Sequence, residues 1–304
     1  MTSDAMPHIQ PNAKPQSKTR MGDAEKAAIA TLRKKPVVAW PTVLLLLASQ
    51  AIVAGVWYLA LNDQISLWLG CLVNTIAYYA LFTPAHDAMH KSVSSKWWIN
   101  EWALYQTAFG YLPLTSGKLL GLMHMQHHRF TNDRLDPDHD LVQDWKNVLF
   151  LWFFWDFRYI WVYNKYRDEY PDINLTRIYT ELALGLSIVG AVAVFFPIEV
   201  LILWFIPTRL MVWLICLVFM YLPHVPHTYK DKDAPFQATL IREGWEWLLT
   251  PLMMYQNYHL AHHLYPTVPF YRYKKVWQAA QGYHESQQPA KVKAFDLHPY
   301  NLPV

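Results

Sequence analysis

The chain has 304 residues, of which 53% are hydrophobic and only 16% are charged. A soluble domain usually carries about 25% charged residues, so the composition indicates a surface that faces lipid. The net charge of +3 is too small to indicate a nucleic-acid-binding protein, and two cysteines in apolar runs exclude a disulfide framework and a CxxC metal site. The 15 tryptophans and 19 tyrosines also indicate a membrane protein, because these side chains favour membrane–water interfaces.

The first segment of the chain, residues 1–36, is polar and lacks the apolar core of a secretory signal peptide. We therefore predict that residues 1–36 form a disordered cytoplasmic tail. The membrane domain is expected over residues 37–280, and a C-terminal tail is expected over residues 281–304.

Four apolar stretches are each long enough to cross a bilayer, which takes about 20 residues. They are predicted over about 37–61, 65–85, 178–196 and 200–222. Very short loops join the first to the second and the third to the fourth, which makes two helical hairpins. Two hairpins place both termini and the segment between the hairpins on one side of the membrane. Nearly all the basic residues fall on that side, so the positive-inside rule predicts that it is cytoplasmic.

Two shorter apolar segments, about 97–114 and 147–163, are predicted to lie along the cytoplasmic leaflet. The second contains Asp156 and Arg158, and a central charge costs roughly 2.5–3.5 kcal/mol on insertion scales, which disfavours a fifth span. The predicted fold is therefore all-α and integral to the membrane, with four transmembrane helices in two hairpins and a cytoplasmic helical cap.

Histidine is unusually frequent, and eight of the 14 histidines fall in three short clusters. Residues three and four apart share one face of a helix, so each cluster presents two or three imidazoles in one direction. One HxxxH pair arises readily by chance in a chain this rich in histidine, whereas two HxxHH triples do not. The clusters are His86 and His90, then His124, His127 and His128, and finally His259, His262 and His263.

All eight clustered histidines fall on the predicted cytoplasmic side, so elements far apart in the sequence are expected to converge there on a metal site. Imidazole suits zinc, copper, iron and nickel, and the ligand type alone leaves the metal open. Zinc usually takes four ligands, so eight imidazoles indicate two ions. We favour a di-iron centre that uses dioxygen as co-substrate. Two zinc ions would instead indicate a membrane hydrolase. No catalytic side chain is expected beyond the metal ligands.

Two more histidines follow the fourth span in the string LPHVPH at 222–227. We predict His224 as a ninth ligand and keep His227 and Asn257 as alternatives. The acidic run at 132–140 follows the second cluster closely. Its carboxylates either orient the ligand imidazoles or form a solvated turn.

The three histidine boxes, in this order and with this topology, resemble those of the membrane fatty acid desaturase superfamily over about residues 40–280. Members of that superfamily are four-span, di-iron, oxygen-dependent enzymes. The resemblance implies that the eight box histidines ligate two irons. In the acyl-CoA desaturases a further histidine upstream of the third box also ligates, and His224 is the natural match.

Several strings are more similar to the bacterial carotenoid-ring hydroxylases than to acyl desaturases. This resemblance implies a hydroxylase that acts on a carotenoid-like or other long apolar lipid in a bacterial inner membrane, with a fatty acyl desaturase as the alternative. No HPGG string of a fused cytochrome b5 domain occurs, so electrons are expected from a separate, ferredoxin-like or flavodoxin-like protein. The strings are HDAMH at 86–90, HMQHHRFTND with its DPD continuation from 124, LPH at 222–224 and QNYHLAHHLYPTVPFYRY at 256–273.

Overall fold

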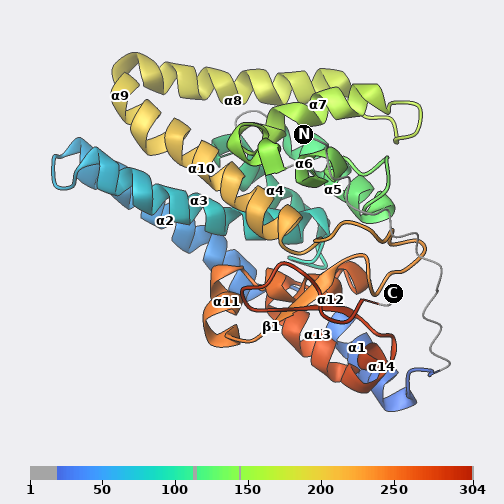
Figure 1. The fold of residues 1–304 in the computed structure, drawn as a ribbon. Helices are drawn as coiled ribbons and strands as arrows, with labels where there is room; N and C mark the ends of the chain where they lie inside the picture. Colours follow the sequence, from blue (N-terminus) through green and yellow to red (C-terminus); the bar gives the residue numbers. More distant parts are fainter. Residues whose placement is uncertain (1–18, 112–114, 144, 303–304) are drawn as a thin grey trace, which may run out of the picture.

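The computed structural model describes residues 19–111, 115–143 and 145–302, and it is mostly helical (Figure 1). Among these residues, four helices are long and apolar enough to cross a membrane, as predicted. The first three are α2 (Trp40–Leu61), α3 (Leu67–Met89) and α8 (Leu175–Phe195). The fourth runs without a break through α9 (Pro197–Glu199), the π-helical η3 (Val200–Phe205), α10 (Ile206–Ile215) and the π-helical η4 (Cys216–Tyr221).

The two hairpins pack against each other through α3 and the fourth span. Asn74 and Tyr78 of α3 both donate hydrogen bonds to the backbone oxygen of Leu203, over 2.7 and 3.3 Å. Gly70 lies at the same crossing, where a Cβ atom would meet the Leu203 side chain at 2.6 Å. These contacts pair polar groups within the apolar region and hold α3 against the first part of the fourth span.

The first part of the cap lies between the hairpins. The predicted interfacial segments are helical there, although residues 112–114 of the first lie outside the described residues. Asp156, one of the charges that disfavoured a fifth span, is buried in an ion pair with Arg209 of α10. The elements are α4 (Trp97–Tyr111), α5 (Gly117–Phe130), α6 (His139–Gln143), η1 (Trp145–Leu149), η2 (Leu151–Phe153) and α7 (Trp155–Lys165).

The second part of the cap follows the fourth span and is not entirely α-helical. A short parallel sheet pairs β1 with β2, with Leu240 opposite Ala290. Sequence periodicity gave no sign of two four-residue strands so far apart. The elements are β1 (Leu240–Glu243), α11 (Glu246–Leu252), η5 (Gln256–Tyr258), α12 (His259–Leu264), η6 (Phe270–Arg272), α13 (Tyr273–Ala279), α14 (Gln281–Ser286) and β2 (Ala290–Lys293).

Both segments predicted as tails contain ordered structure that packs on the cap, and the helix in the first of them corrects the disorder that was predicted for residues 1–36 where the structure describes them. Helix α1 (Asp23–Arg33) lies against α13 and buries Ile29, while residues 1–18 lie outside the described residues. In the predicted C-terminal tail, His284 is fully buried. Its Nδ1 donates to the Trp277 backbone oxygen over 2.9 Å, and its Nε2 accepts from the Tyr265 hydroxyl over 2.8 Å. Apolar faces too short to stand out in the sequence hold both segments.

Candidate metal centre

The structure brings all nine predicted ligand histidines together from four separate elements. The end of α3 presents His86 and His90, α5 presents the second box, α12 presents the third, and the turn after η4 presents His224. Eight of them form two groups in which one ring nitrogen of each side chain lies within 4.8 Å of the others. The first tetrad is His86, His90, His124 and His262, and the second tetrad is His127, His224, His259 and His263.

The ring nitrogens within each tetrad approach one another closely. In the first tetrad, Nε2 of His90 and Nε2 of His124 are 2.7 Å apart. In the second, Nε2 of His259 lies 3.0 Å from Nε2 of both His224 and His263. Nitrogens bound to one ion at about 2.0–2.1 Å would be separated by about 3 Å. The spacing therefore fits ligand sets gathered around a shared centre.

The remaining box histidine, His128, lies between the two tetrads. Its Nε2 is 2.9 Å from Nε2 of His262 in the first tetrad. Its ring stacks on that of His263 in the second tetrad, with ring centroids 4.2 Å apart. The cluster is therefore one continuous array of nine imidazoles rather than two separate sites.

The chemical state of the imidazoles fits a bound metal. His86 is 1% exposed, and neither of its ring nitrogens has a hydrogen-bond partner among the described residues. A buried polar group without a partner costs about 1–3 kcal/mol, which a metal ion at that nitrogen would offset. Burial, helped by the neighbouring histidines, lowers the pKa of His124, His224 and His262 well below the usual value. They are therefore neutral, which is the form that binds metals.

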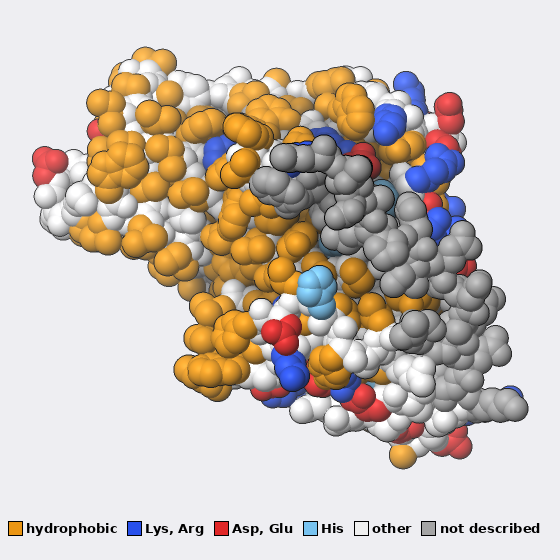
Figure 2. Space-filling view, viewed as in Figure 1, with side chains coloured by type: hydrophobic (Ala, Val, Ile, Leu, Met, Phe, Trp, Pro, Cys, Tyr) orange, Lys and Arg blue, Asp and Glu red, His pale blue; other side chains and the backbone are white. Residues whose placement is uncertain are grey.

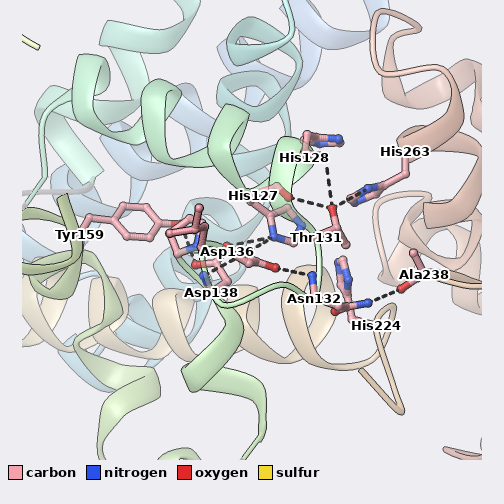
Figure 3. A network of polar contacts seen from close by, with 12 residues as sticks. His127, His128, Thr131, Asn132, Asp136, Asp138, Tyr159, His224, Ala238 and His263 are labelled. Atoms are coloured by element: carbon pink, nitrogen blue, oxygen red, sulfur yellow. Dashed lines mark hydrogen bonds and ion pairs between the residues drawn. The ribbon is translucent and has the colours of Figure 1, made fainter. Parts of the chain in front are cut away.

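A buried acidic network supports the second tetrad (Figure 3). Nδ1 of His127 donates to Oδ1 of Asp136 over 2.9 Å and lies 3.6 Å from Oδ2 of Asp138. Burial opposes protonation of His127, but these carboxylates outweigh it and raise its pKa to about 9. The backbone N–H groups of Asn132 and Asp138 donate to Asp136, and the Tyr159 hydroxyl donates to Asp138 over 3.1 Å. Part of the acidic run thus orients an imidazole, rather than forming only a solvated turn.

Two further contacts hold histidines of the second tetrad. Nδ1 of His259 donates to the side-chain oxygen of Gln256 over 2.5 Å. The Thr131 hydroxyl donates to the backbone oxygen of His127 over 2.7 Å and lies 3.5 Å from Nδ1 of His263. Such contacts fix the ring orientation and leave the opposite nitrogen, Nε2, directed at the centre. Neither Gln256 nor Thr131 belongs to a histidine box or an acidic run, so no pattern in the sequence marks them.

The alternative ligands behave differently from His224. His227 lies in none of the histidine groups, although its ring stacks on that of His224 with centroids 6.0 Å apart. Asn257 is fully buried and donates to the Thr250 hydroxyl over 3.0 Å. The amide oxygen of Asn257 has no hydrogen-bond partner among the described residues, so its role as a ligand stays a prediction.

A narrow cavity of about 20 Å³ opens beside the histidines, which is room for about one water molecule. Histidines of both tetrads line it, so both face the same small space. Apolar side chains form most of its remaining wall, which keeps bulk water away from the histidines. The lining residues are Phe82, His86, Met89, Leu120, His124, His127, Asp138, Tyr159, Phe219, Met220 and His259.

Comparison with known families agrees with this site. A model of the fatty acid desaturase family matches residues 63–291, a range that contains all three boxes and His224. The chain belongs to the fatty acid desaturase family. It is accordingly an oxidoreductase of the membrane desaturase or hydroxylase type, in a family known for di-iron centres. No curated protein sequence matches the chain.

Proposed function

We propose that this protein is a di-iron enzyme that uses dioxygen to oxidise C–H bonds of a long apolar lipid, and that it is a carotenoid-type hydroxylase. The observation that carries the proposal is the array of nine imidazoles, arranged as two tetrads around one cavity with an apolar wall. Two redox metals side by side suit dioxygen chemistry, whereas one zinc site would need only four ligands.

Each tetrad would hold one iron, with His128 between them. Dioxygen activation and removal of hydrogen from an unactivated C–H bond is the chemistry that such a pair of irons supplies. Among the protein's own groups, Asp136 and Gln256 fix the rings of His127 and His259. The neutral state of His124, His224 and His262 lets them bind metal without first losing a proton, whereas His127, whose pKa is raised to about 9, would release a proton as the metal binds.

The cavity wall determines the outcome for the substrate. Phe82, Phe219 and Met220 keep bulk water out, and they would have to move aside to admit a hydrocarbon segment, because the cavity of about 20 Å³ has room for about one water molecule. The carbon presented to the centre is oxidised, so positioning decides between hydroxylation of one carbon and desaturation of two neighbouring carbons. A lipid substrate would enter from the bilayer, between the spans and the cap.

The remaining partners follow from the topology and charge. The basic residues gather on the cap side, so we place the cap and both termini in the cytoplasm of a bacterial cell, with the four helices in the inner membrane. A separate electron carrier of the ferredoxin or flavodoxin type would then deliver electrons to the cap.

A fatty acyl desaturase is the second candidate, and the description of the matched family favours it. The strings around the boxes favour the carotenoid hydroxylase. Both candidates need the same centre, and they differ in the substrate that reaches the cavity.

Expression in a host that makes β-carotene, with pigments and fatty acids both profiled by mass spectrometry, separates the two. Hydroxylated carotenoid is the expected product, whereas new double bonds in phospholipid chains would assign the desaturase. The matched control is His127→Ala, which should give neither product. Metal analysis of the purified protein is the second test, and zinc without iron would overturn the di-iron assignment in favour of a hydrolase.

A further inference from the structure

The segment around α11 presents an apolar surface that the described part of the protein does not cover. We call it the tryptophan surface; it consists of Trp245, Trp247, Leu252 and Phe295, which are 53, 75, 59 and 69% exposed. The Trp245 ring lies 6.1 Å from that of Trp247 and 5.7 Å from that of Phe295, centroid to centroid, so these side chains form one patch. Large aromatic side chains grouped in this way mark a surface with a partner.

The scarcity of charged residues distinguishes this segment from an ordinary water-facing loop. Between Glu243 and Arg272 the chain contains one aspartate, glutamate, lysine or arginine residue, Glu246. Its carboxylate turns back to accept a hydrogen bond from the Gly244 backbone N–H over 3.1 Å. Apart from this carboxylate, α11 carries no aspartate, glutamate, lysine or arginine, as expected for a surface in contact with lipid.

A hydrogen bond fixes the depth of α11 relative to the spans. The Tyr79 hydroxyl donates to the backbone oxygen of Leu252, at the end of α11, over 2.9 Å. Tyr79 lies ten residues before Met89, the last residue of α3, which is roughly 15 Å along the helix axis. All of α3 is about 35 Å long and a hydrocarbon core is about 30 Å thick, so Tyr79 lies inside that core.

The hydrogen bond from Tyr79 satisfies a backbone oxygen at the end of α11, which matters most where no water can reach that oxygen. The last carbonyl groups of a helix have no partner within the helix, and water normally satisfies them. In hydrocarbon no water is available, so each such group needs a partner from the protein. Tyr79 supplies that partner to Leu252 from the side of a membrane-spanning helix.

The backbone at both ends of the segment reverses the chain sharply. Gly244 and Trp245 have φ angles of 89° and 55°, and Met254 and Tyr255 have φ angles of 47° and 65°. Residues other than glycine rarely adopt this left-handed conformation. The chain therefore leaves the cap after β1, forms α11, and returns directly to η5 and the third histidine box. Figure 1 shows α11 at the edge of the cap, beside the cap-side end of α2.

We propose that residues 244–255 form a re-entrant segment that inserts the tryptophan surface into the bilayer leaflet on the cap side. The occupant of the surface is lipid because the surface continues the lipid-facing side of α2, where Trp40 and Leu44 are 62 and 58% exposed. Figure 2 shows hydrophobic side chains over α11 and over the spans on the same face of the molecule. Tryptophan at this level is typical of interfacial anchors. The segment would hold the third box at a fixed distance from the membrane.

Spin labelling of the full chain in lipid nanodiscs tests this insertion. A nitroxide is attached at Trp247→Cys, and at Phe295→Cys in a second variant in case the first fails to fold. Collision rates with oxygen, which concentrates in lipid, and with a water-soluble nickel chelate are then compared. Leu44→Cys on α2 serves as the lipid reference, and Lys232→Cys, whose side chain is 63% exposed beside Asp133, as the water reference. Both native cysteines are buried, and the unsubstituted protein gives their background.

The expected result is a shift of the oxygen-to-nickel ratio at positions 247 and 295 from the water reference towards the lipid reference. A ratio at both positions equal to that at position 232 would overturn the proposal. Dipolar broadening between labels on two protein copies in one nanodisc would also overturn it, because the surface would then be a contact between copies. None of these outcomes depends on the metal or the substrate.

Discussion

The two tetrads of the metal centre are held in place by different means. In the second tetrad, His127 and His259 each donate a hydrogen bond from Nδ1 to a buried side chain, Asp136 or Gln256. In the first tetrad, His86 makes no hydrogen bond through its ring among the described residues. It is held instead by packing, with its ring centroid 6.2 Å from that of Phe82 and 5.6 Å from that of Phe219.

The difference follows from where the histidines lie in the fold. His86 is part of α3, whose last two turns are buried on all sides by neighbouring helices, so the helix itself sets the ring position. His127 and His259 lie in the cap helices α5 and α12, which also carry His124 and His262 of the first tetrad, and there a side-chain hydrogen bond adds to the helix in fixing the ring. A hydrogen-bonded carboxylate also makes an imidazole a stronger donor to a metal. We therefore expect the second tetrad to hold its ion more tightly than the first.

The largest effect is expected from removing one histidine of each tetrad. His86→Ala and His259→Ala should each abolish product formation, because the reaction needs both ions. Metal content, measured by plasma mass spectrometry, should fall by about half in each variant if the tetrads bind separately. The matched control is His227→Ala, since His227 is close to the second tetrad but outside both groups. Equal metal loss in the control would refute the assignment of ligands.

The second largest effect is expected at α7, the helix whose Tyr159 donates to Asp138 beside His127 of the second tetrad. Arg209 of α10 donates two hydrogen bonds of 2.9 Å to the carboxylate of Asp156, which is on α7 together with Tyr159. Arg209→Met leaves this buried carboxylate unpaired and should destabilise the protein by about 3–5 kcal/mol. Thermal unfolding in nanodiscs measures the loss.

Two further variants make the test of this ion pair specific. Arg158→Met removes an ion pair from the same helix, but its partner Asp140 is 60% exposed, so the cost should be at most about 1 kcal/mol. The double variant Asp156→Leu with Arg209→Met should recover much of the lost stability, because no buried charge remains unpaired. If Arg209→Met and Arg158→Met lost the same stability, burial would not make the Asp156–Arg209 pair more costly to break than an exposed pair.

The sequence predicts the four spans and the convergence of the box histidines, because both are governed by local spacing. A span needs an uninterrupted apolar run, and a helix that binds metal needs histidines three or four residues apart. The residues that hydrogen-bond to the box histidines follow no such spacing in the sequence. Asp133 and Asp136 belong to one acidic run, yet Asp136 bonds to His127, whereas Asp133 pairs with lysines near the surface. Only the fold distinguishes these two carboxylates.

The segment around α11 was missed for a related reason. Seven helical residues are too few to resemble a span, although the near absence of charge from 244 to 271 was visible. The depth of the segment relative to the spans follows only from the contact between Tyr79 and Leu252, two residues 173 positions apart. Helix α1 and strand β2 were likewise assigned to tails, because their partners lie at the opposite end of the chain or across the cap.

A smaller effect is expected from loosening His127 without removing it. Asp136→Asn keeps the shape of the side chain but removes the charge that accepts from Nδ1 of His127. Loss of such a partner typically lowers metal affinity or activity by about 10–100-fold. Competition with a chelator measures the affinity, and Asp133→Asn, in the same run, is the control. If Asp136→Asn retained both ions as tightly as the control, the acidic network would have no role in binding.

The smallest effect, about tenfold in metal affinity, is expected from Gln256→Leu, which leaves Nδ1 of His259 without its acceptor. Gln256→Glu should restore the affinity, because a carboxylate accepts the same hydrogen bond. The matched change in the first tetrad is Phe82→Leu, which loosens the packing around His86 without touching a polar group. We expect chelators to remove one ion faster from Gln256→Leu and the other from Phe82→Leu. Loss of the same ion in both variants would contradict this expectation. The hydrogen bond to His259 and the packing around His86 would then stabilise both ions together rather than one ion each.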